Sequence, residues 1–180
     1  MAGRGEKVIL VDAEDRVLGF REKMQAHESG ELHRAVSIFV FDEQGRLLLQ
    51  RRAFSKYHSG GLWANSCCSH PRMGESAAEA ASRRLDEELG VTCELVPAGT
   101  CMYRAEVGQG LTEHELVHLF AGRFVGEASP NPEEVESCRW ESIGSILSDM
   151  AVRPERYAAW FRHYASVLDL GKLADSFGHA

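Results

Sequence analysis

Short apolar runs separated by polar turns dominate the first third of the chain, and this pattern predicts β-strands. Residues 8–11 and 16–20 flank the turn-like sequence DAED and predict a hairpin. After a polar stretch at residues 22–31, the sequence AVSIFVFDEQGRLLLQRR (35–52) contains two strongly β-prone runs around DEQG, whose glycine suits a hairpin turn. We expect this second pair to form the centre of a sheet.

The clearest helix signal spans residues 76–90. Ser76 is followed three residues later by Glu79, which forms a capping box. The interior is rich in Ala, Leu, Arg and Glu, and Gly90 provides a C-terminal stop. We therefore expect one well-defined helix in the middle of the chain.

The second half of the chain predicts further strands and a final helix. Strand-like patterns occupy residues 100–107, 112–124 and 135–143, and the amphipathic sequence PERYAAWFRHYASVLDL (154–170) predicts a helix that begins at Pro154. Strands precede, separate and follow the helices without regular alternation. This order favours an α+β sandwich built on a mixed or antiparallel sheet.

Composition narrows the class of protein. A chain of 180 residues with 44% hydrophobic content suits a single domain that spans residues 1–180. The net charge of -7 argues against nucleic acid as a partner, while it leaves room for a local basic pocket that binds an anion. Five cysteines, including the adjacent Cys67 and Cys68, suit a reducing compartment with free thiols. No apolar run is long enough for a signal peptide or membrane insertion, so we expect a cytoplasmic protein.

The sequence EHELVHLF (113–120) contains an H-E-x-x-H motif, which on a helix is typical of zinc proteases. Its alternation and its β-branched and aromatic content favour a strand instead. On a strand, Glu113 and Glu115 share one face and His114 and His118 share the other. Two neighbouring carboxylates repel each other unless a cation lies between them. The sequence therefore indicates either a cation site or a solvated acidic edge.

Three further histidines make a cation site the stronger interpretation. His27, His33 and His70, together with the two glutamates, would suit a divalent first-row ion in roughly octahedral geometry, and would suit a tetrahedral structural zinc less well. Spacing alone does not show that these residues meet in space.

Across residues 75–91, Glu75 is followed by Arg83, the pair Glu87 and Glu88, and Gly90. This spacing resembles the Nudix signature, a glutamate helix that holds Mg²⁺ over a diphosphate in the Nudix hydrolases. Two positions depart from the signature: Ser69 replaces a glycine and Arg84 replaces a glutamate. Arg84 removes a carboxylate and adds a cation, so we expect the site to attract a diphosphate and hydrolyse it poorly. Ordinary salt bridges between helix residues four apart are the alternative interpretation of this charge pattern. The matching residues are Glu75, Arg83, Leu85, Glu87, Glu88, Gly90 and Val91.

Four motifs in order, LWANSCCSHPRMGES, RLDEELG, YRAE and TEHEL, resemble the type I isopentenyl-diphosphate isomerases, a family with the Nudix fold. The resemblance runs from about Glu6 to about Leu168 and accounts for both departures from the hydrolase signature. It implies a single-domain α/β/α sandwich with a mixed sheet, with its core at about 33–168. It also implies an N-terminal hairpin and metal-binding segment at 6–33 and a C-terminal helix at about 154–170.

The resemblance also implies an activity: conversion of isopentenyl diphosphate to dimethylallyl diphosphate in isoprenoid biosynthesis. Mg²⁺ is implied as a cofactor, with Mn²⁺ or Zn²⁺ at the His/Glu site, and the expected oligomeric state is a monomer or a weak homodimer. The implied catalytic residues are Cys68, Glu115, Tyr103 and Trp160; the diphosphate ligands are Lys23, Arg52, Lys56 and Arg84; the ligands of the first ion are His27, His33, His70, Glu113 and Glu115; and Glu88 would bind a second Mg²⁺ through the diphosphate.

This isomerisation adds a proton to an unactivated alkene and removes another, with a tertiary carbocation between the two steps. An acid and a base on opposite faces are needed, and Cys68 and Glu115 suit these roles, in an order that the sequence leaves open. The main alternative is a Nudix pyrophosphohydrolase that acts on a nucleoside diphosphate derivative. A Nudix-fold binding module without catalysis is a third interpretation. A hydrolase needs neither the thiol nor the distant Glu-x-Glu, and the complete set of candidate ligands argues against lost catalysis.

Overall fold

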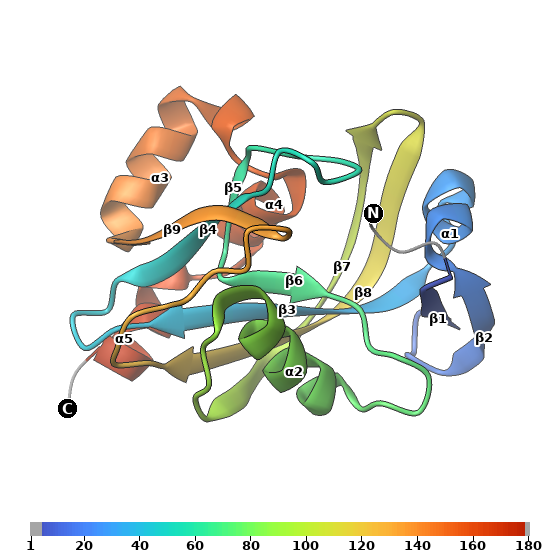
Figure 1. The fold of residues 1–180 in the computed structure, drawn as a ribbon, viewed down its shortest axis with the longest axis horizontal. Helices are drawn as coiled ribbons and strands as arrows, with labels where there is room; N and C mark the ends of the chain where they lie inside the picture. The colour runs from blue at the N-terminus through green and yellow to red at the C-terminus, as the bar shows by residue number, and fades with distance from the viewer. Residues whose placement is uncertain (1–4, 179–180) are drawn as a thin grey trace.

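The computed structural model describes residues 5–178 of the chain, and a mixed sheet forms its middle (Figure 1). Strand β3 (His33–Phe41) lies at the centre of this sheet. It runs parallel to β8 (Leu111–Arg123) on one side and antiparallel to β6 (Cys67–Ser69) on the other. The mixed sheet that the sequence predicts is therefore confirmed.

The remaining strands extend this centre at both ends. The hairpin of β1 and β2 joins β3 through Leu10 and His33, and lies with α1 at the right of the view in Figure 1. Strand β4 pairs with β3, β5 and β9, and β7 pairs along nearly the whole of β8. These strands are β1 (Lys7–Val11), β2 (Val17–Glu22), β4 (Leu47–Arg52), β5 (Trp63–Ala64), β7 (Leu95–Gly108) and β9 (Val135–Glu141).

Helices cover the two faces of the sheet. Along β3, Val36, Ile38 and Val40 pack against α2, whereas Phe39 and Phe41 pack on the other face against the C-terminal helices. This alternation places two apolar layers on opposite sides of one strand, because successive side chains of a strand point to opposite faces. The helices are α1 (Lys23–Ser29), α2 (Ala77–Leu89), α3 (Ile143–Val152), η1 (Pro154–Arg156), α4 (Ala159–Val167) and α5 (Leu170–Gly178).

The predicted capping of α2 is present at both ends. The Ser76 hydroxyl accepts a hydrogen bond from the Glu79 amide, and the Glu79 carboxylate accepts one from the Ser76 amide. At the other end Gly90 adopts a left-handed conformation with φ of +60°, which favours glycine. The cap residues thus fix where this helix begins and ends.

The prediction of one continuous helix at 154–170 is wrong. The segment forms the short 3₁₀ turn η1 and then becomes extended at Tyr157 and Ala158, where the Ala158 amide donates to the Trp63 carbonyl. Helix α4 follows, Leu168 is extended, and α5 starts at Leu170. The chain leaves the helical conformation because pairing with β5 satisfies its backbone better at this point.

Three helices, α1, α3 and α5, were not predicted, and α5 follows the predicted C-terminal helix. Helix α1 lies inside the polar stretch at 22–31, and α3 begins at Ile143, which the sequence assigned to a strand. The expectation of a single domain over 1–180 includes residues 1–4 and 179–180, which lie outside the described part of the chain. Within residues 5–178, every helix is too short or too polar to cross a membrane.

Candidate active site and metal centre

One pocket brings together side chains from distant parts of the chain. It lies where the ends of β6 and β8 meet α2, α4 and the loop after β4. The expected residues that line it are Lys23, Arg52, Lys56, Cys68, His70, Arg84, Glu88, Glu113, Glu115 and Trp160. The expected site residues are therefore close in space, although they span most of the sequence.

Strand β8 supplies the two carboxylates. Glu113 and Glu115 point into the pocket and are 5% and 7% exposed. His114 and His118 face the other side of the strand, where His114 contacts the Gly30 carbonyl and His118 contacts Asp15 at 2.9 Å. The H-E-x-x-H motif is thus part of a strand, and its two histidines do not join its glutamates at one site. This rules out the protease interpretation.

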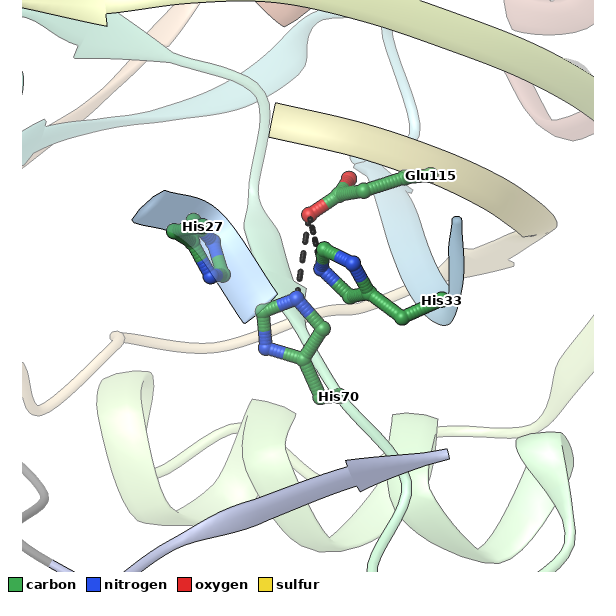
Figure 2. A group of neighbouring side chains, drawn as sticks. All are labelled: His27, His33, His70 and Glu115. Atoms are coloured by element: carbon green, nitrogen blue, oxygen red, sulfur yellow. Dashed lines mark hydrogen bonds and ion pairs between the residues drawn. The ribbon is translucent and has the colours of Figure 1, made fainter. Parts of the chain in front are cut away.

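Four side chains meet at one point next to the pocket (Figure 2). Their nearest ligand atoms all lie within 4.8 Å of one another. His27 comes from the end of α1, and His33 opens β3. The parallel pairing of β3 with β8 sets His33 directly beside Glu115. His70 follows β6, and its Nε2 lies 3.0 Å from Glu115 Oε1. All four side chains are buried.

Hydrogen bonds fix the tautomers of two of these imidazoles. The Nδ1 of His27 lies 2.7 Å from the Lys23 carbonyl, and the Nδ1 of His33 lies 2.8 Å from the Glu31 carbonyl. A carbonyl oxygen only accepts, so both Nδ1 atoms carry the proton and both Nε2 atoms keep a lone pair. These Nε2 atoms are buried without a hydrogen-bond partner. Buried lone pairs without partners are costly, so the donor set fits a divalent cation.

Glu113 belongs to a second, overlapping group. Its neighbours there are His27 and His58, again with all ligand atoms within 4.8 Å of one another. His58 Nε2 lies 3.2 Å from Glu113 Oε1. The five expected ligands are therefore gathered around His27, but Glu113 groups with His58, whereas Glu115 groups with His33 and His70. The sequence analysis missed His58, and only its position two residues after Lys56 could have pointed to it.

The two glutamates have opposite pKa shifts. Burial, together with the neighbouring charge of Glu115, raises the pKa of Glu113 well above its usual range. Burial also acts to raise the pKa of Glu115, but the contacts with His33 and His70 outweigh it and lower that pKa. In His70, burial lowers the pKa to about 3. The metal-free centre thus pairs an ionised Glu115 with a neutral His70.

The adjacent cysteines have different surroundings. Cys67 is fully buried in the apolar layer under α2. Cys68 lines the pocket, and its sulfur lies 3.1 Å from the Ser37 hydroxyl and 3.3 Å from the Asn65 side-chain oxygen. Burial raises the pKa of Cys68, and the charge of Glu115 adds to this effect. Of the two thiols, Cys68 is the one that can reach a ligand in the pocket.

Tyr103 and Trp160 flank the carboxylates. Tyr103 pairs with Glu115 across β7 and β8, and its buried hydroxyl has no hydrogen-bond partner. Burial raises the pKa of Tyr103, and Glu113 and Glu115 raise it further. Trp160 projects from α4 and is 3% exposed, and the Arg52 guanidinium lies 5.0 Å from its ring centroid. An aromatic ring thus already stacks against a cation in the pocket.

The four expected diphosphate ligands form a basic rim. Three of them have acidic partners: Lys23 pairs with Glu6 at 3.1 Å, Lys56 pairs with Glu134, and Arg84 pairs with Glu88 at 2.5 Å. Arg52 makes no ion pair with any residue in the described part of the chain. Arg52 is therefore the rim cation that is most available to an anion.

Helix α2 shows both features that its sequence suggested. Arg83 and Arg84 pair with Glu87 and Glu88 as residues four apart do on a helix. Glu88 also accepts a hydrogen bond from Gln50 and faces the pocket. The helix salt bridges and a carboxylate in the pocket therefore coexist.

Comparisons with known proteins agree with this geometry. The NUDIX domain model matches residues 31–161. An isopentenyl-diphosphate Delta-isomerase 2 from Aromatoleum aromaticum is 53% identical over 155 residues, covering 86% of this chain and 82% of that protein. An isopentenyl-diphosphate Delta-isomerase from Burkholderia multivorans is 53% identical over 156 residues, covering 87% of this chain and 89% of that protein.

Solved structures support the fold. A protein from Deinococcus radiodurans superposes with a TM-score of 0.71 at 21% identity, covering 95% of this chain and 98% of that one. A MutT protein from Methanosarcina mazei has a TM-score of 0.60 at 23% identity, covering 81% and 94%. These structures share the fold, and the NUDIX domain match together with the sequence relatives shows that the chain belongs to the Nudix family and, within it, to the isopentenyl-diphosphate Delta-isomerases.

Proposed function

We propose that the protein converts isopentenyl diphosphate to dimethylallyl diphosphate in isoprenoid biosynthesis. The observation that carries the proposal is the pairing of a thiol and a buried carboxylate in one cation-rimmed pocket. Cys68 and Glu115 are close enough for the charge of Glu115 to raise the pKa of the thiol. A thiol and a carboxylate that face one substrate can add a proton at one carbon and remove one at another.

Trp160 in the pocket and the neighbouring Tyr103 support the charge that develops between these two steps. The π face of Trp160 stabilises a carbocation by about 2 kcal/mol when water is excluded. This stabilisation arises only once positive charge has formed, which lowers the barrier without tightening substrate binding. Tyr103, with its unpartnered hydroxyl beside Glu113 and Glu115, relays or holds a proton. Helix α4 covers the pocket and limits access of water to the cation.

The basic rim would bind the diphosphate without attacking it. Arg52 offers a charged, planar donor that suits two phosphate oxygens. Lys23, Lys56 and Arg84 would exchange their acidic partners for phosphate oxygens, and Glu88 would hold a Mg²⁺ that supplies further positive charge to the diphosphate. Arg84 occupies a position where a hydrolase needs a carboxylate. We therefore favour isomerisation over pyrophosphate hydrolysis as the function.

The histidine and glutamate cluster would bind the first ion, which we propose to be Mn²⁺ or Zn²⁺, with Mg²⁺ at the diphosphate. When bound, the ion supplies positive charge that keeps Glu115 ionised. His27, His33, His70, Glu113 and Glu115 would provide its ligands. We further propose a cytoplasmic enzyme that is a monomer or a weak homodimer, in line with its five free cysteines.

A labelling assay tests this function. The purified protein is incubated with Mg²⁺ and isopentenyl diphosphate in deuterated water, and products are identified by mass spectrometry with a parallel phosphate assay. Deuterium-labelled dimethylallyl diphosphate without phosphate release is the expected result. Phosphate or monophosphate without the isomer would overturn the proposal in favour of a pyrophosphohydrolase.

The neighbouring cysteines provide a matched pair of variants for the same assay. Cys68→Ala should abolish isomerisation, because it removes one of the two proton-transfer groups. Cys67→Ala removes a thiol of the same size from beneath α2, outside the pocket, and should retain activity. Isomerisation by Cys68→Ala at the wild-type rate would contradict the assigned role of the thiol.

A further inference from the structure

His58 is a buried imidazole to which the proton-transfer scheme gives no role. It lies between β4 and β5, is 4% exposed, and lines the same pocket as Cys68. Its Nε2 atom is buried and has no hydrogen-bond partner. A buried polar atom without a partner costs free energy, so this position needs an explanation.

The surroundings of His58 consist of other metal-binding atoms. Its ligand nitrogen, a Glu113 oxygen and a His27 nitrogen all lie within 4.8 Å of one another. The His27 Nε2 atom and the Glu113 Oε2 atom are likewise buried without hydrogen-bond partners. Two imidazole nitrogens without hydrogen-bond partners and a carboxylate with one unpartnered oxygen therefore converge on one small space.

The contact between His58 and Glu113 resembles two neighbouring ligands of one metal ion more than it resembles a hydrogen bond. Their atoms are 3.2 Å apart, but Nε2 is not aligned to donate to the carboxylate. Two adjacent ligands of an octahedral ion at about 2.1 Å lie about 3 Å apart, and each points at the ion and past the other ligand. The observed separation and the missing alignment both match this arrangement.

The other nitrogen of His58 allows the required tautomer. Nδ1 lies 3.1 Å from the hydroxyl of Ser59, which can either donate or accept a hydrogen bond. When the hydroxyl accepts, Nδ1 carries the proton and Nε2 keeps its lone pair. His27 and His33 have this same tautomer, fixed by backbone carbonyls.

We propose that His58 is an additional protein ligand of the metal centre. His58 binds the ion beside Glu113 and completes a set of six ligands, four imidazoles and two carboxylates. His27 belongs to both groups and has one free nitrogen, so it can join them at a single ion. A set with four imidazole nitrogens favours Zn²⁺ or Co²⁺ over Mg²⁺, because imidazole suits borderline ions and Mg²⁺ prefers oxygen. This inference rests on the proposed metal centre.

Metal binding is measured on the full chain after removal of bound metal with a chelator. Zn²⁺ alone is titrated into wild type, His58→Ala and His118→Ala in competition with a chromophoric chelator, and Co²⁺ alone is used to record the visible ligand-field bands. His118→Ala is the matched control, since it removes an imidazole from the opposite face of β8. We expect His58→Ala to weaken Zn²⁺ binding at least about 10-fold and to change the Co²⁺ spectrum, with His118→Ala unchanged.

A measurement on the wild-type protein removes any dependence on the folding of the variant. Long-range ¹H–¹⁵N spectra of the Zn²⁺-loaded protein identify each imidazole that binds metal through a ring nitrogen, and four such imidazoles are expected. Three bound imidazoles, with His58 absent among them, would overturn the role of His58 and leave the metal centre standing. Failure of the wild-type protein to bind Zn²⁺ or Co²⁺ would overturn the metal centre and this inference together.

Discussion

Cys68 Sγ lies 3.1 Å from Ser37 Oγ, across the pairing of β6 with β3 in which these two residues are direct partners. Asn65 closes the contact into a ring, because its amide donates to Ser37 Oγ at 2.8 Å and its oxygen lies 3.3 Å from the sulfur. Because Ser37 Oγ accepts from the Asn65 amide, its own hydrogen is free to donate to the sulfur, while the thiol donates to the Asn65 oxygen. The thiol is thereby held in one orientation.

Ser37→Ala should lower kcat for isomerisation about 5-fold and leave KM nearly unchanged. The lost hydrogen bond is worth about 1 kcal/mol, and it orients a reacting atom without contacting the diphosphate rim. Steady-state kinetics with isopentenyl diphosphate provide the measurement, and thermal unfolding shows whether the variant is folded. A folded variant with wild-type kcat would mean that the ring does not position the thiol.

Trp160→Leu should lower kcat about 30-fold, whereas Trp160→Phe should retain most of it. The leucine variant loses the π face, worth about 2 kcal/mol toward a cation, and phenylalanine keeps a weaker one. Rates are compared at saturating substrate, because the contact of Trp160 with Arg52 also affects diphosphate binding. Equal rates for the two variants would show that Trp160 only fills space.

Arg84→Gln should raise KM for isopentenyl diphosphate at least about 10-fold, with a smaller change in kcat. The substitution removes a cation from the pocket rim and leaves the reacting groups in place. Arg83→Gln is the matched control on the same helix, since Arg83 binds Glu75 and Glu87 outside the pocket. A similar KM for both variants would argue that Arg84 serves only as a helix salt bridge.

Local pattern was sufficient to predict several parts of this site. Alternation showed that Glu113 and Glu115 share a strand face, and the capping box located the ends of α2. Helix α1 was missed because its sequence, KMQAHES, lacks an apolar stripe. Its ends depend on a cap from the Glu22 side chain and on the left-handed Gly30.

The convergence of the ligands could not be derived from spacing. His33 meets Glu115 only because β3 and β8 are parallel in one particular register. The two residues lie far apart in the sequence. Resemblance to a family supplied the identities of the expected residues. It supplied nothing for His58, whose proximity to Glu113 depends on the path of the loop after β4.

The metal-free protein should become more stable as pH rises from about 4.5 to 6.5. Burial lowers the pKa of His58 to about 2 and that of His70 to about 3, and it also lowers the pKa of His27. These imidazoles therefore gain protons when the chain unfolds below pH 6.5. Glu113 has the opposite effect on stability. Its pKa is raised, so the folded protein keeps a proton on Glu113 that the unfolded chain releases above about pH 4.5. Each group contributes at most about 1.4 kcal/mol per pH unit, and three imidazoles outweigh one carboxyl. Thermal unfolding in the presence of a chelator across this pH range measures the slope of stability against pH. Glu113→Gln should make this slope steeper. A flat profile in both proteins would show that the imidazoles are not held neutral.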